Sequence, residues 1–323
     1  MNSVVCTLFE NEYHHGLAAL TNSLYKKGFR NTVYAGYRGA IPDWANPLED
    51  IEVSGWNKAK IFKPLENLNL IFLELDTSYH LTNYKPDFML RLWDIPELEV
   101  DLLFYFDPDI VLTAPWSFIE VWAQQGIAVC EDLKSPIEKY HPRRVGWRKY
   151  YSDYNISLNF KNSKYVNGGF IGISKDRKDF LNLWKTLQEY MAEHIGGLEK
   201  SSITKGKELD SEFSFDFSCF GATDQDALNA TIEACDYNVS FMGKEAMALQ
   251  NGSPVLMPHA LGQPKPWAYK PFQRFLSGDI PRLVDKEFWI SVSYPIQVYS
   301  PNTVKIMNWS LKFYSFLSRF YSK

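Results

Sequence analysis

The fold of this protein is decided by the stretch Leu102-Leu103-Phe104-Tyr105-Phe106-Asp107-Pro108-Asp109. Its five apolar residues predict a buried strand, because a strand covered on both faces reads as a continuous apolar run. Two carboxylates follow directly, separated by one proline. Ligands of open α/β sheets bind at the carboxyl ends of the strands. The stretch therefore predicts both a central strand and a ligand site at its end.

Strand and helix patterns alternate on the amino-terminal side of this stretch. Residues 3–9, 31–36 and 69–74 read as strands, and the apolar spacing of residues 14–28 and 85–98 predicts helices. This β-α-β-α-β order implies parallel strands joined by right-handed crossovers. We therefore expect an α/β protein with a Rossmann-like sheet.

The carboxyl-terminal side continues with further elements. The pattern predicts strands at 126–130, at 165–173 and within 286–300, and helices at 176–195, 224–235 and 302–321.

The composition is that of a globular protein. Of the 323 residues, 46% are hydrophobic and 22% are charged, and the net charge of −4 leaves no general basic surface for nucleic acid. The four cysteines form no C-x-x-C pair, so we predict free thiols rather than a zinc cluster. No signal peptide and no apolar run of roughly 18 to 20 residues is visible, so a cytoplasmic location is expected.

Two segments of the second half also carry candidate site residues. Asn167-Gly168-Gly169 enters an apolar strand, where glycines allow a ligand to approach the backbone; a simple tight turn is the alternative. In Thr223-Asp224-Gln225-Asp226, Thr223 could cap a helix whose first turn is acidic. Alternatively, Asp224 or Gln225 lies at the reacting group.

A divalent cation is the ligand that the Asp107/Asp109 pair would bind. Mg²⁺ and Mn²⁺ take carboxylate oxygens together with substrate phosphates. His259, far along the chain, could be a third ligand, and Lys265 could offset phosphate charge. The alternatives are a polar turn that ends a strand and a structural histidine.

The order of these motifs, D-x-D, N-G-G, D-Q-D and H-x-x-G-x-x-K-P-W, resembles family 8 glycosyltransferases of the GT-A fold. That group contains glycogenin and bacterial lipopolysaccharide galactosyl- and glucosyltransferases. Residues 7–13 resemble the nucleotide-binding first strand of the family, and the resemblance covers residues 3–270. It implies a single mixed central sheet flanked by helices. The catalytic domain would span 1–270, and a C-terminal helical extension, 271–323, would end in a basic aromatic helix.

The resemblance implies a role for each matching residue. Asp107, Asp109 and His259 would bind the metal, usually Mn²⁺, with Mg²⁺ as the alternative. Asp224 and Gln225 would lie nearest the anomeric carbon as catalytic residues. The UDP-sugar donor would contact Thr7, Leu8, Phe9, Glu10, Tyr13, Asp107, Pro108, Asp132, Asn167, Gly168, Gly262 and Lys265, with Tyr13 stacked on uracil. The family also has a basic residue ahead of the D-x-D motif, and both Lys85 and Arg91 fit.

The implied reaction is retaining transfer of a hexose, glucose or galactose, from a UDP-sugar to a glycan, glycolipid or protein acceptor. Phe9-Glu10 and Gly168 depart from the usual family residues. One alternative is a sugar-phosphate nucleotidyltransferase, but such enzymes have a glycine-rich basic loop where 9–12 is acidic. The other is a non-catalytic carbohydrate-binding relative, which would not need the full set of metal ligands.

Two segments bear on the acceptor and on membranes. Residues 133–165 carry several Arg, Trp and Tyr residues, which could form a lid that shapes the acceptor site or a solvated basic loop. Residues 302–323 carry cations and aromatic residues but no acid. Such a helix could contact a membrane peripherally, or it could pack on the domain.

Overall fold

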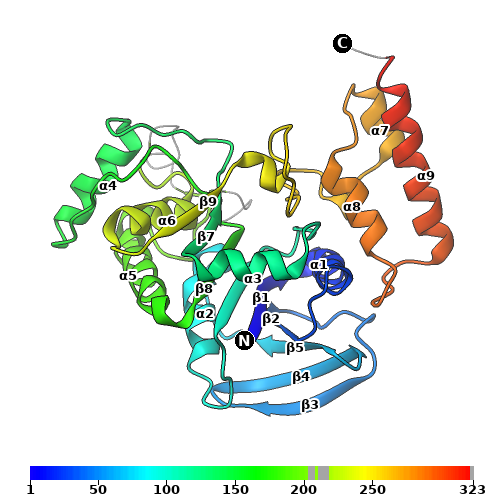
Figure 1. Ribbon diagram of the computed structural model, residues 1–323, viewed down its shortest axis with the longest axis horizontal. Coiled ribbons are helices and arrows are strands. Elements are labelled where there is room, and N and C mark those ends of the chain that lie inside the picture. The colour runs from blue at the N-terminus through cyan, green and yellow to red at the C-terminus, as the bar shows by residue number, and fades with distance from the viewer. Residues whose placement is uncertain (203–207, 210–217, 321–323) are drawn as a thin grey trace.

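One mixed sheet forms the centre of the molecule (Figure 1). The computed structural model describes residues 1–202, 208–209 and 218–320, and within these ranges nine strands are joined in the order β3-β4-β5-β2-β1-β6-β8-β7-β9. The last three residues of the predicted basic tail, 321–323, lie outside the described residues. The strands are β1 Ser3–Glu10, β2 Thr32–Arg38, β3 Leu48–Val53, β4 Trp56–Leu65, β5 Leu68–Glu74, β6 Leu102–Phe106, β7 Ile127–Cys130, β8 Phe170–Ser174 and β9 Val239–Met242.

The centre of the sheet is parallel. Strand β1 pairs in parallel with β2 and with β6, and β2 pairs in parallel with β5. Strand β8 then runs antiparallel between β6 and β7, which makes the sheet mixed. Because β6 has neighbours on both sides and helices over both faces, all five of its side chains are buried, as its sequence predicts.

Helices cover both faces of the sheet. On one face, α2 Lys85–Trp93, α5 Lys178–Ile195 and α6 Thr223–Ala234 enclose the larger hydrophobic core, and α4 Pro142–Ser152 packs against its edge. On the other face, α1 His14–Lys26 and α3 Trp116–Gln124 enclose the second core. The predicted single Rossmann-like mixed sheet flanked by helices is confirmed.

An antiparallel hairpin at the sheet edge is missing from the prediction. Strands β3 and β4 lie between the predicted strands 31–36 and 69–74. Their sequences are rich in charge, and ion pairs such as Lys60–Asp50 and Lys63–Glu49 join their exposed side chains. A strand with one solvated face lacks the continuous apolar run by which a central strand is recognised.

One helix and one strand are shorter than predicted. Helix α2 ends at Trp93 rather than at residue 98, because proline disfavours helical backbone in the residue before it and Ile95 precedes Pro96. The strand predicted at 165–173 begins only at Phe170. Residues 166–169 instead form an irregular segment at the end of the sheet.

The C-terminal part is helical throughout its regular structure, so the strands predicted within 286–300 are wrong. Helices α7 Pro271–Leu276, α8 Leu283–Ser291 and α9 Pro301–Leu317 are drawn in orange and red in Figure 1, and α8 contacts α1. Val284 and Phe288 are buried, and their spacing of four residues is helical. Phe288 and Trp289 pack on Ala19 of α1 in a third hydrophobic cluster. The predicted C-terminal helical extension is confirmed, whereas the domain limits 1–270 and 271–323 stay a prediction.

Candidate active site

A cleft of about 350 Å³ opens at the carboxyl ends of β1 and β6. It is lined by the end of β1 with Tyr13, by the loop that leads into α2, by residues 107–109 and 167–169, by the start of α6, and by the loop 259–265. Open α/β sheets bind their ligands here, at the carboxyl ends of the parallel strands.

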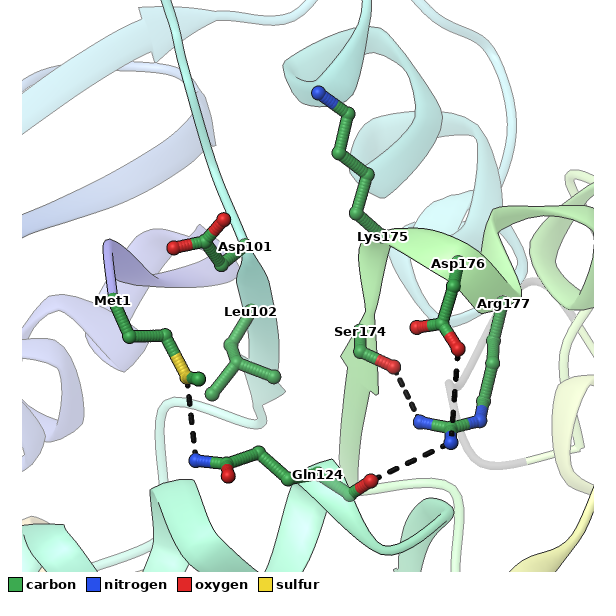
Figure 2. Close-up of a pocket in the computed structure, with 8 residues that line it drawn as sticks. All are labelled: Met1, Asp101, Leu102, Gln124, Ser174, Lys175, Asp176 and Arg177. Atoms are coloured by element: carbon green, nitrogen blue, oxygen red, sulfur yellow. Dashed lines mark hydrogen bonds and ion pairs between the residues drawn. The ribbon is translucent and has the colours of Figure 1, made fainter.

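A second, shallower cavity of about 700 Å³ lies at the opposite end of these strands, where β1 and β6 begin (Figure 2). One of its cations is paired within the lining: the Arg177 guanidinium contacts Asp176, Ser174 and the carbonyl of Gln124. The amide of Gln124 also contacts the sulfur of Met1. The described residues that line this cavity include no converging metal ligands or acids. The candidate site is therefore the cleft at the carboxyl ends of β1 and β6.

Backbone pairing brings the two halves of the predicted metal site together. Ile110 and His259 form an antiparallel bridge, and the Ala260 N–H donates to the carbonyl of Asp109 at 3.1 Å. On the other side, the Asp107 N–H donates to the carbonyl of Gly169 at 2.7 Å. The D-x-D turn is therefore fixed between two segments distant in sequence.

Asp107, Asp109 and His259 converge as potential metal ligands. The Nε2 of His259 lies 3.2 Å from Oδ1 of Asp109 and 3.8 Å from Oδ2 of Asp107. One ligand atom from each residue lies within 4.8 Å of the others. Two carboxylate oxygens and an imidazole suit Mn²⁺ or Mg²⁺, so the donor set fits the predicted ion.

The second oxygen of each aspartate is held by a neighbour. Oδ1 of Asp107 accepts from the hydroxyl of Tyr105 at 2.8 Å and lies 3.2 Å from Nζ of Lys85. Oδ2 of Asp109 accepts from Nζ of Lys265 at 2.6 Å. Burial opposes ionisation of Asp109, but His259 and Lys265 hold its pKa below the ordinary value, so this carboxylate is charged at neutral pH.

Lys85 is a buried cation beside the metal ligands. Its side chain is 2% exposed, and Nζ donates to the carbonyl of Gly168 at 2.8 Å and to Oδ2 of Asp224 at 3.0 Å. Burial alone would lower the pKa of Lys85, but the carboxylates of Asp107 and Asp224 outweigh it and raise the pKa, so the ammonium stays charged. Burial raises the pKa of Asp224, and the charge of Lys85 opposes that rise.

Arg91, the other basic residue that fits the family spacing, lies outside the cleft. Its guanidinium stacks over Trp56 at 3.7 Å and donates to the Tyr84 hydroxyl and to the carbonyl of Gly55. Of the two predicted alternatives, the structure brings Lys85 into the cleft.

The two glycines make room for other side chains of the site. A Cβ at Gly169 would lie 2.5 Å from the His259 ring and 3.0 Å from Oδ2 of Asp107. A Cβ at Gly168 would lie 2.9 Å from Oδ2 of Asp224. The sequence suggested close approach of a ligand to this backbone, and here it is the site's own residues that come close.

The remaining predicted site residues, the donor contacts and the catalytic Gln225, are divided between the cleft and the layer behind it. Leu8, Phe9, Glu10, Tyr13, Pro108, Asn167, Gly168, Gln225 and Gly262 line the cleft. Asp132 lies behind Asn167 and accepts from its side-chain amide at 2.8 Å. Thr7 is buried within β1, away from the lining.

The start of α6 is capped differently from the prediction. Thr223 is the first helical residue rather than the cap, and Ala222 occupies the cap position. The carboxylate of Asp226 accepts the Ala222 N–H at 2.6 Å and also pairs with Arg143. Thr223 is thus free of the capping role and lies with Asp224 in the cleft lining.

Helix α4 within residues 133–165 supports α6 rather than covering the cleft. Arg143 and Arg144 are buried and pair with Asp226 and Glu233 of α6. The alternative of a solvated basic loop is therefore wrong. No described residue of the segment is among those lining the cleft.

Sequence reasoning missed Tyr105, which lines the cleft, and Arg38, which contacts the lining residue Glu10. Tyr105 precedes Asp107 by two positions, so the period of a strand puts both on one side, and this signal could have found it. Arg38, at the end of β2, pairs with Glu10 at 2.8 Å. Only the parallel register of β1 and β2, which places Glu10 beside Arg38, brings them together.

A second cluster of potential ligands, Glu12, His14 and His15, lies at the start of α1. The indole N–H of Trp44 donates to Nδ1 of His14 at 3.1 Å, so Nε2 carries the proton of the neutral ring. Glu12 is largely exposed. The Asp107 cluster is more buried than this one.

No protein-family model and no curated protein sequence matches this chain. Among solved structures 230 chains match, one of which is the apo structure of WbbM, a bifunctional glycosyltransferase. That match has a TM-score of 0.48 and 13% identity, and it covers 95% of this chain and 52% of that chain. This chain thus spans about half the length of the WbbM structure, and a similarity of this size decides neither activity nor substrate.

Proposed function

We propose that this protein is a metal-dependent, retaining glycosyltransferase of the GT-A fold, related to family 8. It would transfer a hexose, glucose or galactose, from a UDP-sugar. The observation that carries the proposal is the convergence of Asp107, Asp109 and His259 in one cleft, with Lys265 beside them and Asp224 across from them.

The nucleotide end of the donor would lie along β1. Glu10 lines the cleft at the end of β1 and would accept a hydrogen bond from the base edge, and the Tyr13 ring could stack on the base. Lys265 would offset the charge of the diphosphate. A divalent cation held by Asp107, Asp109 and His259 would neutralise that diphosphate as it leaves.

The sugar would lie between residues 167–169 and the start of α6. Asn167 lines the cleft there and is oriented by Asp132. As the bond from the anomeric carbon to the diphosphate breaks, the acceptor hydroxyl would form a new bond on the same face. The departing diphosphate oxygen would take the acceptor proton, so no strong protein base is required. Asp224, held by Lys85, would stabilise the developing positive charge of the sugar.

The acceptor is a glycan, glycolipid or protein in this proposal. Peripheral contact with an anionic membrane through α9 belongs to the same proposal. Among the described residues every helix is too short or too polar to span a bilayer.

Asp109→Asn tests the proposal, because it preserves the size of the side chain but removes the carboxylate. With Mn²⁺ and a panel of UDP-, GDP- and CMP-sugars, we expect the wild type to hydrolyse a UDP-hexose slowly. Since losing one group that stabilises transition-state charge costs about 100-fold or more, the variant should lose at least that factor.

Asp50→Asn is the matched control, because Asp50 is a carboxylate that pairs with Lys60 on the exposed sheet edge. It should keep wild-type turnover. Full Mn²⁺-dependent turnover by the Asp109 variant would refute the proposal. Donor binding without turnover in the wild type would favour the carbohydrate-binding alternative, and transfer of a nucleotidyl group onto a sugar phosphate would favour the nucleotidyltransferase.

A further inference from the structure

The loop 259–265 supplies two residues of the candidate site, His259 and Lys265, but its tip lies at the surface. Gly262 and Gln263 are exposed, and Gly262 has a φ of +68°. From inside the cleft, Nζ of Lys265 donates to the carbonyl of Ala260 at 2.7 Å and to Asp109 at 2.6 Å. These contacts fix the inner side of the loop, so the outer side needs a support of its own.

Arg282, which precedes α8 in the C-terminal extension, supplies that outer support. Its NH1 donates to the carbonyl of Leu261 at 2.9 Å, and its NH2 donates to the carbonyl of Pro264 at 2.7 Å. One guanidinium thus spans the tip of the loop. The Trp289 indole adds a third contact from the extension, a hydrogen bond to the carbonyl of Pro266 at 3.1 Å.

Asp285 holds this guanidinium in place. Its side chain is fully buried and accepts from Arg282 at two points, Nε at 2.9 Å and NH2 at 2.8 Å. Oδ2 also accepts the Arg282 backbone N–H at 3.0 Å. A two-point pair of this kind fixes the plane of the guanidinium, so its remaining N–H groups point at the loop without further ordering.

We propose that Arg282, oriented by Asp285, is a positioning residue that holds the loop 259–265 in its donor-binding shape. The C-terminal extension is then a structural part of the active site. The inference rests on the proposed function in one respect, the identity of the ligand that binds the loop. The contacts between Arg282 and the loop are present whatever that ligand is.

Arg282→Lys is the most informative change. It keeps the positive charge for the buried Asp285, but one ammonium cannot reach Asp285 and both loop carbonyls in the planar fork that arginine provides. The loop would then have to be ordered when the donor binds. We expect UDP with Mn²⁺ to bind about tenfold more weakly, and KM for the donor to rise with little change in kcat.

The measurements use the full chain of the wild type, of Arg282→Lys and of Arg274→Lys. Arg274 is the matched control, because it lies in the same extension but pairs with Asp279 at the surface. Calorimetry with UDP and Mn²⁺ gives affinity, and amide hydrogen exchange of 257–268 against 102–106 gives loop order. Faster exchange only in 257–268, with weaker UDP binding, supports the proposal.

Wild-type affinity and wild-type exchange in Arg282→Lys would overturn the proposal. The double variant Arg282→Gln/Asp285→Asn removes both charges, so that no carboxylate is left buried without its partner. Fast exchange through the whole chain in both variants would also overturn it, since Arg282 would then serve general stability. If the wild type binds no UDP or Mn²⁺, the proposed function fails, while the exchange of 257–268 still decides the role of Arg282.

Discussion

Lys85 shows how one buried charge organises the candidate site. An ammonium has three N–H donors and no acceptor. Here it faces Asp107, Asp224 and the carbonyl of Gly168, which come from three different segments. A buried cation without partners would be costly, so the three acceptors and Lys85 hold one another in place.

Lys85→Met should therefore lower the activity strongly. The change leaves two carboxylates close together without their shared cation and frees the side chain of Asp224. We expect turnover with a UDP-sugar and Mn²⁺ to fall about 100-fold or more. Steady-state kinetics checks this, and circular dichroism confirms that the variant is folded.

Arg91→Met is the matched control for that prediction. Because Arg91 only stacks on Trp56 and bonds outside the cleft, its loss should leave turnover within about threefold and lower the free energy of unfolding by about 0.5–1 kcal/mol. The reverse pattern, with Arg91 essential and Lys85 dispensable, would show that the donor binds elsewhere.

Tyr105 is the neighbour that orients Asp107. Because groups that hydrogen-bond a metal ligand commonly contribute 10- to 100-fold to affinity, we expect Tyr105→Phe to weaken Mn²⁺ binding by about tenfold. Titration of Mn²⁺ by calorimetry measures it. Tyr34→Phe, another buried tyrosine, should bind Mn²⁺ as the wild type does; equal affinity in both variants would refute this role of Tyr105.

Helix α9 has an unusual division between buried and exposed side chains. Only Val304 and Leu311 of the helix are buried, and they pack against α8. Several of its other large apolar side chains face solvent: Ile306 and Trp309 are each 63% exposed, and Phe316 is 54% exposed. The helix also carries Lys305 and Lys312 and no acid, so its exposed side chains suit an anionic membrane surface. The membrane proposal therefore extends to these residues.

We expect the double variant Trp309→Ser/Phe316→Ser to lose binding to vesicles that contain anionic lipid, as measured by co-sedimentation. Tyr140→Ser, which replaces an exposed aromatic residue elsewhere, should bind as the wild type does. Substitution is a better test than removing the helix, because removal would expose the apolar residues of α8 on which Val304 and Leu311 pack. Equal sedimentation of wild type and double variant would refute membrane contact through α9.

Over the whole molecule, ligand binding should be coupled to stability, because the site is assembled from distant segments that unfolding separates. A ligand that binds only the folded state at 100 times its Kd adds about 2.7 kcal/mol. We therefore expect UDP with Mn²⁺ to raise the Tm and EDTA to reverse the rise. Asp109→Asn should show no such shift; an equal shift in that variant would mean that the ions bind elsewhere.

The sequence by itself determined the centre of the fold and the types of residue in the site. Strand β6 has both faces covered, so its apolar run reveals it, and the D-x-D turn follows from where that strand ends. The helices α1, α5 and α6 are recognisable because their apolar residues recur with helical spacing. The sequence did not reveal the hairpin β3–β4, because one of its faces is solvated and its strands lack a continuous apolar run.

Only the tertiary structure decided which of these residues meet. Bridge pairing of Ile110 with His259 joins segments far apart in the chain, and the choice between Lys85 and Arg91 depends on which way α2 faces. The support of the 259–265 loop by Arg282 has no local sequence signal. The physical reason is that hydrophobic periodicity reports burial of single elements, whereas hydrogen bonds between loops depend on how those elements pack.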